Sequence, residues 1–420
     1  MTVQLNRVQT LLAVFATALA AVFLVASITG SLAEAKPAKS KKNNKNKKLG
    51  VVKGPSGLAF YNQKPKKMPK RHGRLIWQRN ATKATRLSAA SSTRTVLYSS
   101  KTPAGKMVTV SGTIAMPKGK APRGGWPIIT YAHGTTGIAD KCAPSRVAVK
   151  DPNDYVSYAD VIQNGWLKAG YAVARTDYQG LGTPGVHPFL IGKPAGRSVL
   201  DIVRAARDLN PKISNKYVIA GHSQGGHASL WAAGIASSWT PDLKLKGTVA
   251  FAPASHLKLQ ASLLESIPVP NPLSALAAMV VRGAQEASDA IKPAELIADE
   301  PLAFYPQTET ECLDRLAQPD NLGGIAPNVL IREGSDLTSL LDVLDDNNPD
   351  VKTAAPILLA QGKADSTTYM FLTDMLNLEL LAKGDKVDYR TYEGVDHSGV
   401  LEAASDDVDA FLGKRLPSGR

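Results

Sequence analysis

The sequence has few of the residue patterns that hold metal ions or cofactors. It contains only two cysteines among 420 residues, too few for paired CxxC motifs, and it has no HExxH motif. The stretch GLGTPG, residues 180–185, fits the dinucleotide fingerprint GxGxxG, but Pro184 and Pro188 prevent the helix that this fingerprint must open. We therefore interpret it as a rigid loop at the edge of a site, and we expect no metal ion and no cofactor.

The two cysteines, Cys142 and Cys312, form an even pair in a chain that has the marks of export. Disulfides persist in oxidising compartments, so we expect these two cysteines to be bonded to each other. The prediction rests on compartment and parity alone, because their spacing says nothing about geometry. Two unrelated buried thiols are the alternative.

Long apolar runs are confined to the N-terminus. Residues 11–28 (LLAVFATALAAVFLVASI) follow a short leader with Arg7 and precede a small-x-small site at residues 33–35, so residues 1–35 are typical of a signal peptide. A retained membrane anchor is the alternative, since the run is just long enough to span a bilayer. No cysteine follows the run, which argues against a lipid anchor. We expect a secreted protein, with association to the cell envelope as a further option.

Acidic residues are missing from one long stretch. Residues 36–86 contain 17 Lys and Arg and no Asp or Glu, more than the net charge of +14 of the whole chain. Residues 36–56, with the run KPAKSKKNNKNKK, cannot bury enough apolar surface to fold and are interpreted as a basic linker. The linker could also contact anionic wall polymers or lipid headgroups, whereas nucleic acid is not an expected partner of an exported chain.

Beyond the linker, β-branched and aromatic runs alternate with amphipathic helical patterns, which is typical of an α/β sheet. We expect an antiparallel opening pair at 93–99 and 107–116, and then strands at 127–132, 171–176 and 216–220. Helical patterns at 158–169 and 198–209 separate these later strands, so the strands should be parallel, with their C-terminal ends along one edge. In open α/β sheets that edge carries the site.

The motif GHSQGG, residues 221–226, has the context of a nucleophile elbow. It follows the strand-like run KYVIA and precedes a helical pattern rich in small residues. The turn is so tight that Gly221 and Gly225 must lack side chains for Ser223 to project. We predict Ser223 as a nucleophile; an ordinary N-cap serine in a glycine-rich turn is the alternative.

The base and the acid should follow Ser223 along the chain. His397 comes directly after a strand-like run at 387–392, and Asp365 follows the apolar run PILLAQ at 356–361. Asp365 can accept the imidazole N–H and stabilise the imidazolium, whereas its rival Asp396 adjoins His397 and would have to fold back. His222, beside the nucleophile, is expected only to pack and make local hydrogen bonds.

An oxyanion hole needs two donors. The first expected donor is the backbone N–H of Gln224, directly after the nucleophile. The second is the N–H of Thr135 in the loop HGTTG, which follows the strand WPIITYA. His133 in this loop is expected to be structural, and an ordinary glycine turn is the alternative for the loop itself.

Several stretches together resemble the secretory lipase family, the fungal lipase A type and its bacterial relatives. They are DYQGLGTPGVHPFL, YAHGTTG with a following CAPS, and GHSQGG, with FYNQKP and HGRLI near the start. The similarity runs from about residue 57 to the C-terminus, and the lysine-rich linker is not part of it. The resemblance implies a secreted serine esterase of the α/β-hydrolase fold, acting on acyl esters without a cofactor. It also implies a helical cap, and its nucleophile, acid and base match Ser223, Asp365 and His397.

The cap can also be placed from the chain itself. About a hundred residues separate the strand GTVAFAPAS from PILLAQ, far more than a simple crossover needs. We expect an α/β-hydrolase core at 57–255 and 351–420, with a mostly parallel sheet, and a helical cap at 256–350. An apolar lid there would shelter an acyl chain, and Met279 or Val280 on the run at 273–281 would line it. A cap that merely buries its own apolar face is the alternative.

The first functional hypothesis is a secreted carboxylic ester hydrolase, a lipase or esterase, with an acyl ester or lipid as substrate. An acyltransferase to a wall or lipid alcohol could use the same three residues. A wall-associated binding protein on a hydrolase scaffold is the alternative from a different class.

Overall fold

The computed structural model describes residues 52–147 and 154–418. The predicted signal peptide at 1–35 and residues 36–51 of the predicted basic linker at 36–56 lie outside the described residues. Within the described ranges, no helix combines the length and the apolar character needed to cross a membrane.

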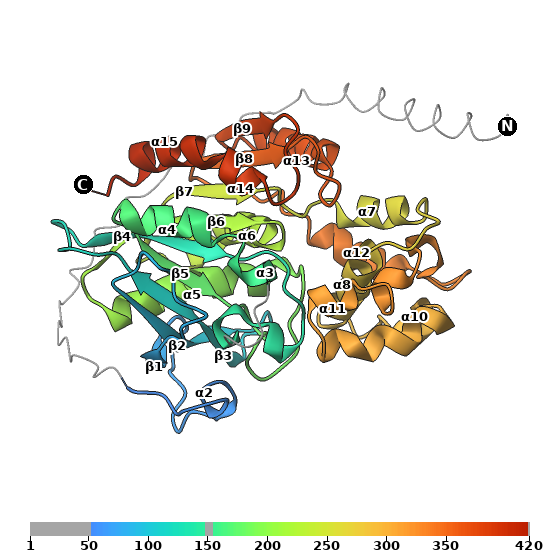
Figure 1. Cartoon of the computed structure of the whole chain (residues 1–420), viewed down its shortest axis with the longest axis horizontal. Helices are drawn as coiled ribbons and strands as arrows, with labels where there is room; N and C mark the ends of the chain where they lie inside the picture. The colour runs from blue at the N-terminus through green and yellow to red at the C-terminus, as the bar shows by residue number, and fades with distance from the viewer. Residues whose placement is uncertain (1–51, 148–153, 419–420) are drawn as a thin grey trace, which may run out of the picture. The chain divides into compact units, whose positions relative to one another are not determined.

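A nine-stranded sheet forms the centre of the described unit, with the strand order β1-β2-β3-β5-β4-β6-β7-β8-β9 (Figure 1). The first three strands pair antiparallel, and β3 also pairs antiparallel with β5. The strands from β4 onward run parallel to one another. Their bounds are β1 Leu75–Asn80, β2 Ser92–Lys101, β3 Met107–Met116, β4 Trp126–Ala132, β5 Ala172–Thr176, β6 Ile213–His222, β7 Lys244–Phe251, β8 Ile357–Gly362 and β9 Val387–Tyr392. The predicted α/β fold with a mostly parallel sheet is thus confirmed.

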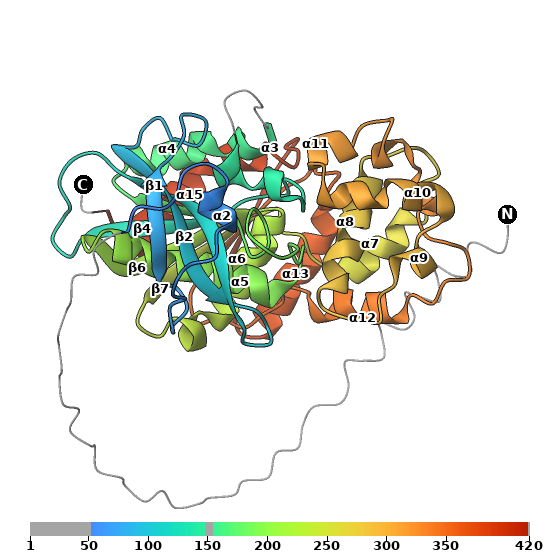
Figure 2. The ribbon, with the colours of Figure 1, turned by 90° about the horizontal axis from the view of Figure 1, so that it is seen from below.

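Helices cover both faces of this sheet, as the two ribbon views show (Figures 1 and 2). One face packs against α5 Gly192–Leu209, α6 Gln224–Trp239 and α13 Met370–Ala382. The other face packs against α4 Asp160–Lys168, α14 Val400–Ala403 and α15 Ser405–Arg415. Helix α5 begins six residues before the predicted start at 198, because Pro194 lies in its first turn, where proline is tolerated.

Full burial of the central strands explains why their sequences predicted strands clearly. All seven residues of β4 and all six of β8 are buried, so these central parallel strands read as continuous apolar runs. The edge strand β9 instead alternates between exposed and half-buried positions. The strand at the opposite edge, β1, was not predicted. Its sequence LIWQRN is neither a continuous apolar run nor a regular alternation of apolar and polar residues.

The residues between β7 and β8 form a helical insertion with a hydrophobic core of its own. Its helices are α7 Leu257–Leu264, α8 Leu273–Gln285, α9 Pro293–Leu296, α10 Asp299–Phe304, α11 Leu313–Leu316 and α12 Thr338–Asp346. Two residues of the loop that precedes α5, Phe189 and Leu190, are buried in this core. A disulfide between Cys142 and Cys312 also joins the insertion to the loop after β4. Short helices α2 (Ala59–Asn62) and α3 (Asp154–Ser157) complete the described elements of regular helix.

Candidate active site

Ser223 occupies the turn between β6 and α6 in a backbone conformation that few side chains adopt. Its φ is 58° and its ψ is −119°, a conformation that costs about 1–3 kcal/mol and is typical of a nucleophile elbow. The flanking glycines leave no room for side chains. A Cβ on Gly221 would lie 2.2 Å from the carbonyl oxygen of Gly225, and a Cβ on Gly225 would lie 1.9 Å from that of Ala132. The close approach of helix α6 to strand β4 therefore requires glycine and lifts Ser223 above the sheet edge.

His397 and Asp365, predicted as base and acid, lie side by side. The Nδ1 of His397 is 2.7 Å from the Oδ2 of Asp365. Asp365 also accepts hydrogen bonds from the backbone amides of Thr367 and Thr368, from the Thr368 hydroxyl, and from the Gln361 side chain. Burial alone would raise the pKa of Asp365, but the His397 bond and these donors outweigh it and hold the pKa below its usual value. The carboxylate thus stays ionised and can orient the ring of His397.

The rival acid, Asp396, is engaged elsewhere. Its Oδ1 accepts a hydrogen bond from the backbone amide of Gly399 at 2.8 Å. This bond closes a turn at the start of the segment that leads to α14, so the Asp396 side chain stabilises its own loop. Of the two carboxylates, the geometry pairs Asp365 with His397.

His222 makes a contact that the sequence could not indicate. Its Nε2–H donates to the backbone carbonyl of His397 at 2.7 Å, and the Tyr158 hydroxyl donates to its Nδ1 at 2.7 Å. Burial, reinforced by the nearby His397, lowers the pKa of His222 to about 3, so its ring is neutral and its tautomer is set by these two partners. The expected packing role is therefore correct but incomplete, because His222 holds the loop that carries His397.

The two expected oxyanion donors flank Ser223. Gln224 is the first residue of α6, where a backbone N–H has no acceptor within the helix, and Thr135 lies in the loop after β4. Both residues and Ser223 line one cavity. In the described ranges, no backbone hydrogen bond uses the amide of Thr135. These two N–H groups remain the candidates for an oxyanion hole next to Ser223.

The side chain of Gln224 is held by the loop that sequence analysis placed at the site edge. Its Nε2 donates to the Nε2 of His187 at 2.8 Å, and His187 in turn donates from Nδ1 to the carbonyl of Gln179 at 2.9 Å. Burial lowers the pKa of His187 to about 4, which keeps Nε2 an acceptor. No helix follows the GLGTPG stretch directly, as expected, and His187, two residues after the stretch, makes the contact with Gln224. The motif had indicated the loop but not His187.

His133 is structural, in agreement with the expectation. Its Nδ1 donates to the carbonyl of Gly134 at 2.6 Å, and its own carbonyl accepts the Tyr178 hydroxyl at 2.8 Å. Burial lowers its pKa to about 4. A Cβ on Gly134 would lie 2.5 Å from the Tyr158 hydroxyl, so this glycine lets the loop pack against the pair of Tyr158 and His222.

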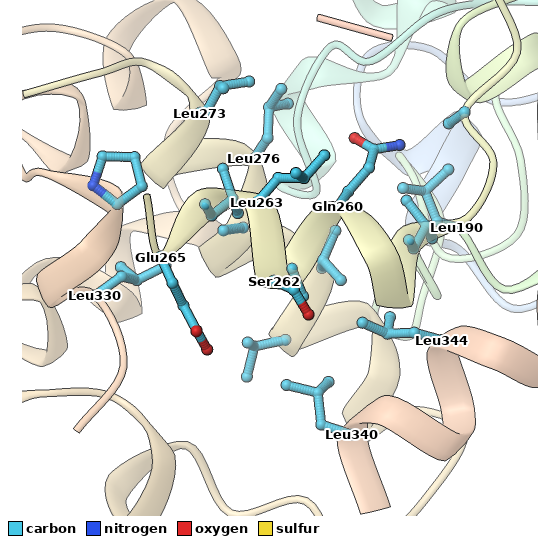
Figure 3. A pocket seen from close by; sticks show the side chains of 18 of the residues that line it. Leu190, Gln260, Ser262, Leu263, Glu265, Leu273, Leu276, Leu330, Leu340 and Leu344 are labelled. Atoms are coloured by element: carbon cyan, nitrogen blue, oxygen red, sulfur yellow. The ribbon is translucent and has the colours of Figure 1, made fainter. Parts of the chain in front are cut away.

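Two cavities meet at Ser223 and Thr135. One extends from Ser223 into the helical insertion and is lined mainly by apolar side chains from α7, α8 and α12, several of which Figure 3 shows. The other contains His397 together with the polar residues Ser366 and Ser398. Val280 lines the first cavity, as predicted, but Met279 does not; it is fully buried in the core of the insertion, on another face of α8. Neighbouring positions on a helix differ by about 100° in direction, and the sequence alone could not choose between them.

The described residues contain no cluster of three or more His, Cys, Asp or Glu side chains that could hold a metal ion. The groups gathered at the edge of the sheet are a hydroxyl, an imidazole, a carboxylate and two backbone amides. This set suits acyl transfer.

Comparison with known proteins gives a family for part of the chain. Residues 155–313 match the family model described as secretory lipase. Lipase A of Moesziomyces aphidis is 32% identical over 126 residues, which cover 29% of this chain and 26% of that protein. A probable inactive lipase of Mycobacterium tuberculosis is 29% identical over 171 residues, which cover 37% of this chain and 36% of that protein. The chain thus matches only about a quarter to a third of the length of these curated relatives.

Solved structures extend the likeness to most of the described unit. Candida antarctica lipase A superposes with a TM-score of 0.68 at 18% identity, over 88% of this chain and 87% of that one. The rice cell wall degrading esterase LipA from Xanthomonas oryzae superposes with a TM-score of 0.66 at 18% identity, over 84% of this chain and 100% of that one. At such identities the likeness concerns the fold. The resemblance to the secretory lipase family is confirmed, and the chain has the α/β-hydrolase fold of lipases and esterases.

Proposed function

We propose that this protein is a secreted serine carboxylic ester hydrolase that cleaves acyl esters through an acyl-enzyme on Ser223. The observation that carries the proposal is the position of Ser223 where the two cavities meet. One cavity is apolar, and the other contains His397, whose Nδ1 is held by the ionised Asp365. The match to the secretory lipases supports both the ester substrate and the export of the chain.

In the first half of the proposed reaction, Ser223 Oγ attacks the ester carbonyl while His397 Nε2 takes its proton. The tetrahedral oxyanion accepts hydrogen bonds from the amides of Thr135 and Gln224. His397 then returns the proton to the alcohol oxygen as its bond to the acyl carbon breaks. In the second half, a water gives a proton to His397 and attacks the acyl carbon. His397 then returns that proton to Ser223 Oγ as the bond between Oγ and the acyl carbon breaks and the acid leaves.

The apolar cavity suits the acyl part of the substrate. Its lining includes leucines of α7, α8 and α12, and it begins beside Ser223, where the acyl carbon would be bonded. Burying a chain there would stabilise the bound ester by about 0.8 kcal/mol for each methylene removed from water. Esters with chains of several carbons are therefore the proposed substrates.

The test is a series of initial rates on p-nitrophenyl esters from acetate to palmitate, using protein that begins at Lys36. Ser223→Ala, prepared in the same way, is the blank. We expect hydrolysis that is absent from the variant and increases from acetate toward longer chains. Equal rates for the two proteins would exclude the hydrolase.

A second arm of the same experiment addresses the two alternatives. Suppose that a fluorophosphonate labels Ser223 but the protein hydrolyses no ester. Formation of a new acyl ester when an alcohol is added would then identify an acyltransferase. Absence of labelling would favour the alternative of a binding protein on a hydrolase scaffold. This class is of interest because one relative is described as a probable inactive lipase.

A further inference from the structure

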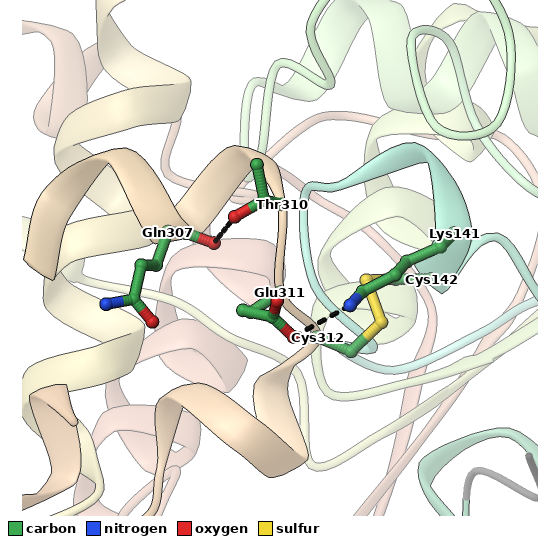
Figure 4. The surroundings of a disulfide bond; sticks show 6 residues. All are labelled: Lys141, Cys142, Gln307, Thr310, Glu311 and Cys312. Atoms are coloured by element: carbon green, nitrogen blue, oxygen red, sulfur yellow. Dashed lines mark hydrogen bonds and ion pairs between the residues drawn. A yellow bond between two sulfur atoms is a disulfide. The ribbon is translucent and has the colours of Figure 1, made fainter. Parts of the chain in front are cut away.

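Figure 4 shows the disulfide between Cys142 and Cys312. It lies next to Gly137, in the loop of the proposed oxyanion donor Thr135, because a Cβ on Gly137 would be 2.7 Å from the Cys142 sulfur. Cys142 closes a short 3-10 turn that follows the HGTTG loop, and Cys312 directly precedes α11 of the helical insertion. The two cysteines are 170 residues apart in sequence, and both are buried. Beside them on the surface, Lys141 Nζ pairs with Glu311 Oε2 at 2.7 Å. The insertion is thus attached covalently and by an ion pair to the segment after Thr135.

The same part of the insertion bonds the HGTTG loop itself. The backbone amide of Leu313 donates to the carbonyl of Thr136 at 3.0 Å, and Gly137 forms an isolated antiparallel bridge with Cys312. Gly137 has a φ of 133°, and a Cβ there would lie 2.7 Å from the Cys142 sulfur and 3.1 Å from the Cys312 Cα. The loop and the insertion therefore approach as closely as two backbones can.

Thr135 is held from two sides by these contacts. On the side of the sheet, the Tyr178 hydroxyl bonds the carbonyl of His133, two residues before Thr135. On the side of the insertion, Leu313 bonds the carbonyl of Thr136, one residue after it. The Thr135 N–H itself belongs to the peptide unit whose carbonyl, that of Gly134, accepts a hydrogen bond from His133 Nδ1 at 2.6 Å. The Leu313 bond adds to this by fixing the carbonyl of Thr136, and a backbone amide can aim at an oxyanion only if the peptides around it are fixed.

We propose that Leu313 and the Cys142–Cys312 disulfide are positioning residues for the oxyanion hole: they hold the amide of Thr135 toward the acyl oxygen on Ser223. The proposal rests on the ester hydrolysis proposed above and adds a part of the helical insertion to its machinery. Reduction of the disulfide should then lower kcat more than it changes KM, because the oxyanion exists only in the tetrahedral states.

The first test replaces the Leu313 amide. Leu313 is the first residue of α11, a position that favours proline, and Cys312 before it has the extended ψ of 167° that a following proline needs. Leu313→Pro therefore removes the N–H that bonds Thr136 with little cost to the helix. Leu313→Ala is the matched control, because it keeps the N–H and truncates the side chain further.

We expect kcat of Leu313→Pro to fall by about 10- to 100-fold while KM changes by less than about threefold, the size expected when one oxyanion donor is displaced. Leu313→Ala, which keeps the N–H, should lose at least about tenfold less kcat than Leu313→Pro. The affinity for an alkyl trifluoromethyl ketone, whose adduct carries the oxyanion, should fall in parallel with kcat/KM. Equal values of kcat for the two variants would overturn the role of the Leu313 amide.

The second test removes the disulfide. The parent protein is reduced, with alkylation of both thiols as the check, and assayed beside Cys142→Ser/Cys312→Ser well below the melting temperature of each. We expect kcat of both to fall by about tenfold or more, with no response of the double variant to reductant. An unchanged kcat in the alkylated protein would overturn the positioning role of the disulfide.

End-point labelling of Ser223 by a fluorophosphonate separates the possible failures. A stoichiometric end point in a variant shows that its site is folded, so a loss of kcat is then a loss of positioning. Failure of the parent itself to label or to hydrolyse esters would instead remove the proposed function on which this inference rests.

Discussion

At the scale of single residues, the contact between His222 and the carbonyl of His397 links the nucleophile elbow to the loop of the base. His222→Phe would remove this bond, and His397 would lose part of its fixed position. We expect kcat to fall by about tenfold or more with little change in KM, measured on a p-nitrophenyl ester. Tyr158→Phe is the control, since it leaves the N–H of His222 in place; a larger loss in the control would contradict the assignment.

Asp365 gives a second prediction at this scale. Asp365→Asn keeps the size of the side chain but presents no carboxylate to the Nδ1–H of His397. By analogy with serine hydrolases that lose this acid, kcat should fall by about 10⁴-fold. The matched variant Asp396→Asn should keep most of its activity, because Asp396 bonds only Gly399 in its own loop. Comparable losses in the two variants would refute the choice of acid.

Ser223, Asp365 and His397 could be proposed from the sequence because each follows a strand-like run, and parallel strands bring their C-terminal ends to one edge. The residues that support these three could not be proposed from the sequence. The bond from His222 joins atoms 175 residues apart, and that from Gln224 to His187 spans 37. No pattern in the sequence encodes such pairs, because they depend on how loops fold back across the sheet.

At the scale of elements, the contact of α6 with β4 depends on Gly225. Gly225→Ala would place a methyl group 1.9 Å from the Ala132 carbonyl oxygen, so helix and strand would have to separate. We expect the free energy of unfolding to fall by more than about 3 kcal/mol. In Gly413→Ala, at an exposed position of α15, the new methyl meets nothing within 4 Å, and a gain of about 0.5–1 kcal/mol is expected. Urea unfolding measures both, and similar changes in the two variants would contradict the packing argument.

Helix α8 carries a prediction about acyl length. Val280→Asp would place a charge in the apolar cavity, so we expect palmitate ester hydrolysis to fall at least about tenfold more than acetate ester hydrolysis. Leu259→Asp is the control, because Leu259 is exposed on α7 and does not line the cavity. If Val280→Asp reduces both esters equally, the cavity does not hold the acyl chain. Met279→Asp would be a poor test, because it would place a charge in the core of the insertion.

Strands and helices were predicted well where they are fully buried, and less well at the sheet edge and at the start of α5. Strands β4 and β8 read as continuous apolar runs because both of their faces are covered. Strand β1 escaped detection because it lies at the sheet edge and mixes half-buried polar and apolar side chains. The start of α5 was placed too late because Gly192, Pro194 and Gly196 weaken the helical pattern, although tertiary packing buries all three.

At the scale of the whole molecule, four buried neutral histidines govern stability in mild acid. Burial lowers the pKa of His133, His187 and His227 to about 4 and that of His222 to about 3. In the unfolded chain these rings titrate near 6.5, so between the two values the unfolded state binds more protons. Stability is therefore full above about pH 6.5 and falls as the pH drops toward 4, by up to about 1.4 kcal/mol per pH unit for each histidine.

His227 allows this to be measured away from the proposed chemistry. It donates from Nε2 to the carbonyl of Asn347 at 2.8 Å and lies within α6. The free energy of unfolding in urea, measured from pH 7.5 to 5, should fall less steeply for His227→Gln than for the parent, by about one proton. Parallel slopes would show that His227 does not titrate between the two states.

The bond between Cys142 and Cys312 has a consequence for the cell that makes the protein. If the disulfide positions the oxyanion loop as proposed, the newly made chain would be a poor hydrolase for as long as its thiols stay reduced, as they do in the cytosol. Under the proposed export, esters inside the producing cell would then be spared during synthesis, and activity would begin only when an oxidising environment closes the bond. Formation of the disulfide after export would in this way activate the enzyme.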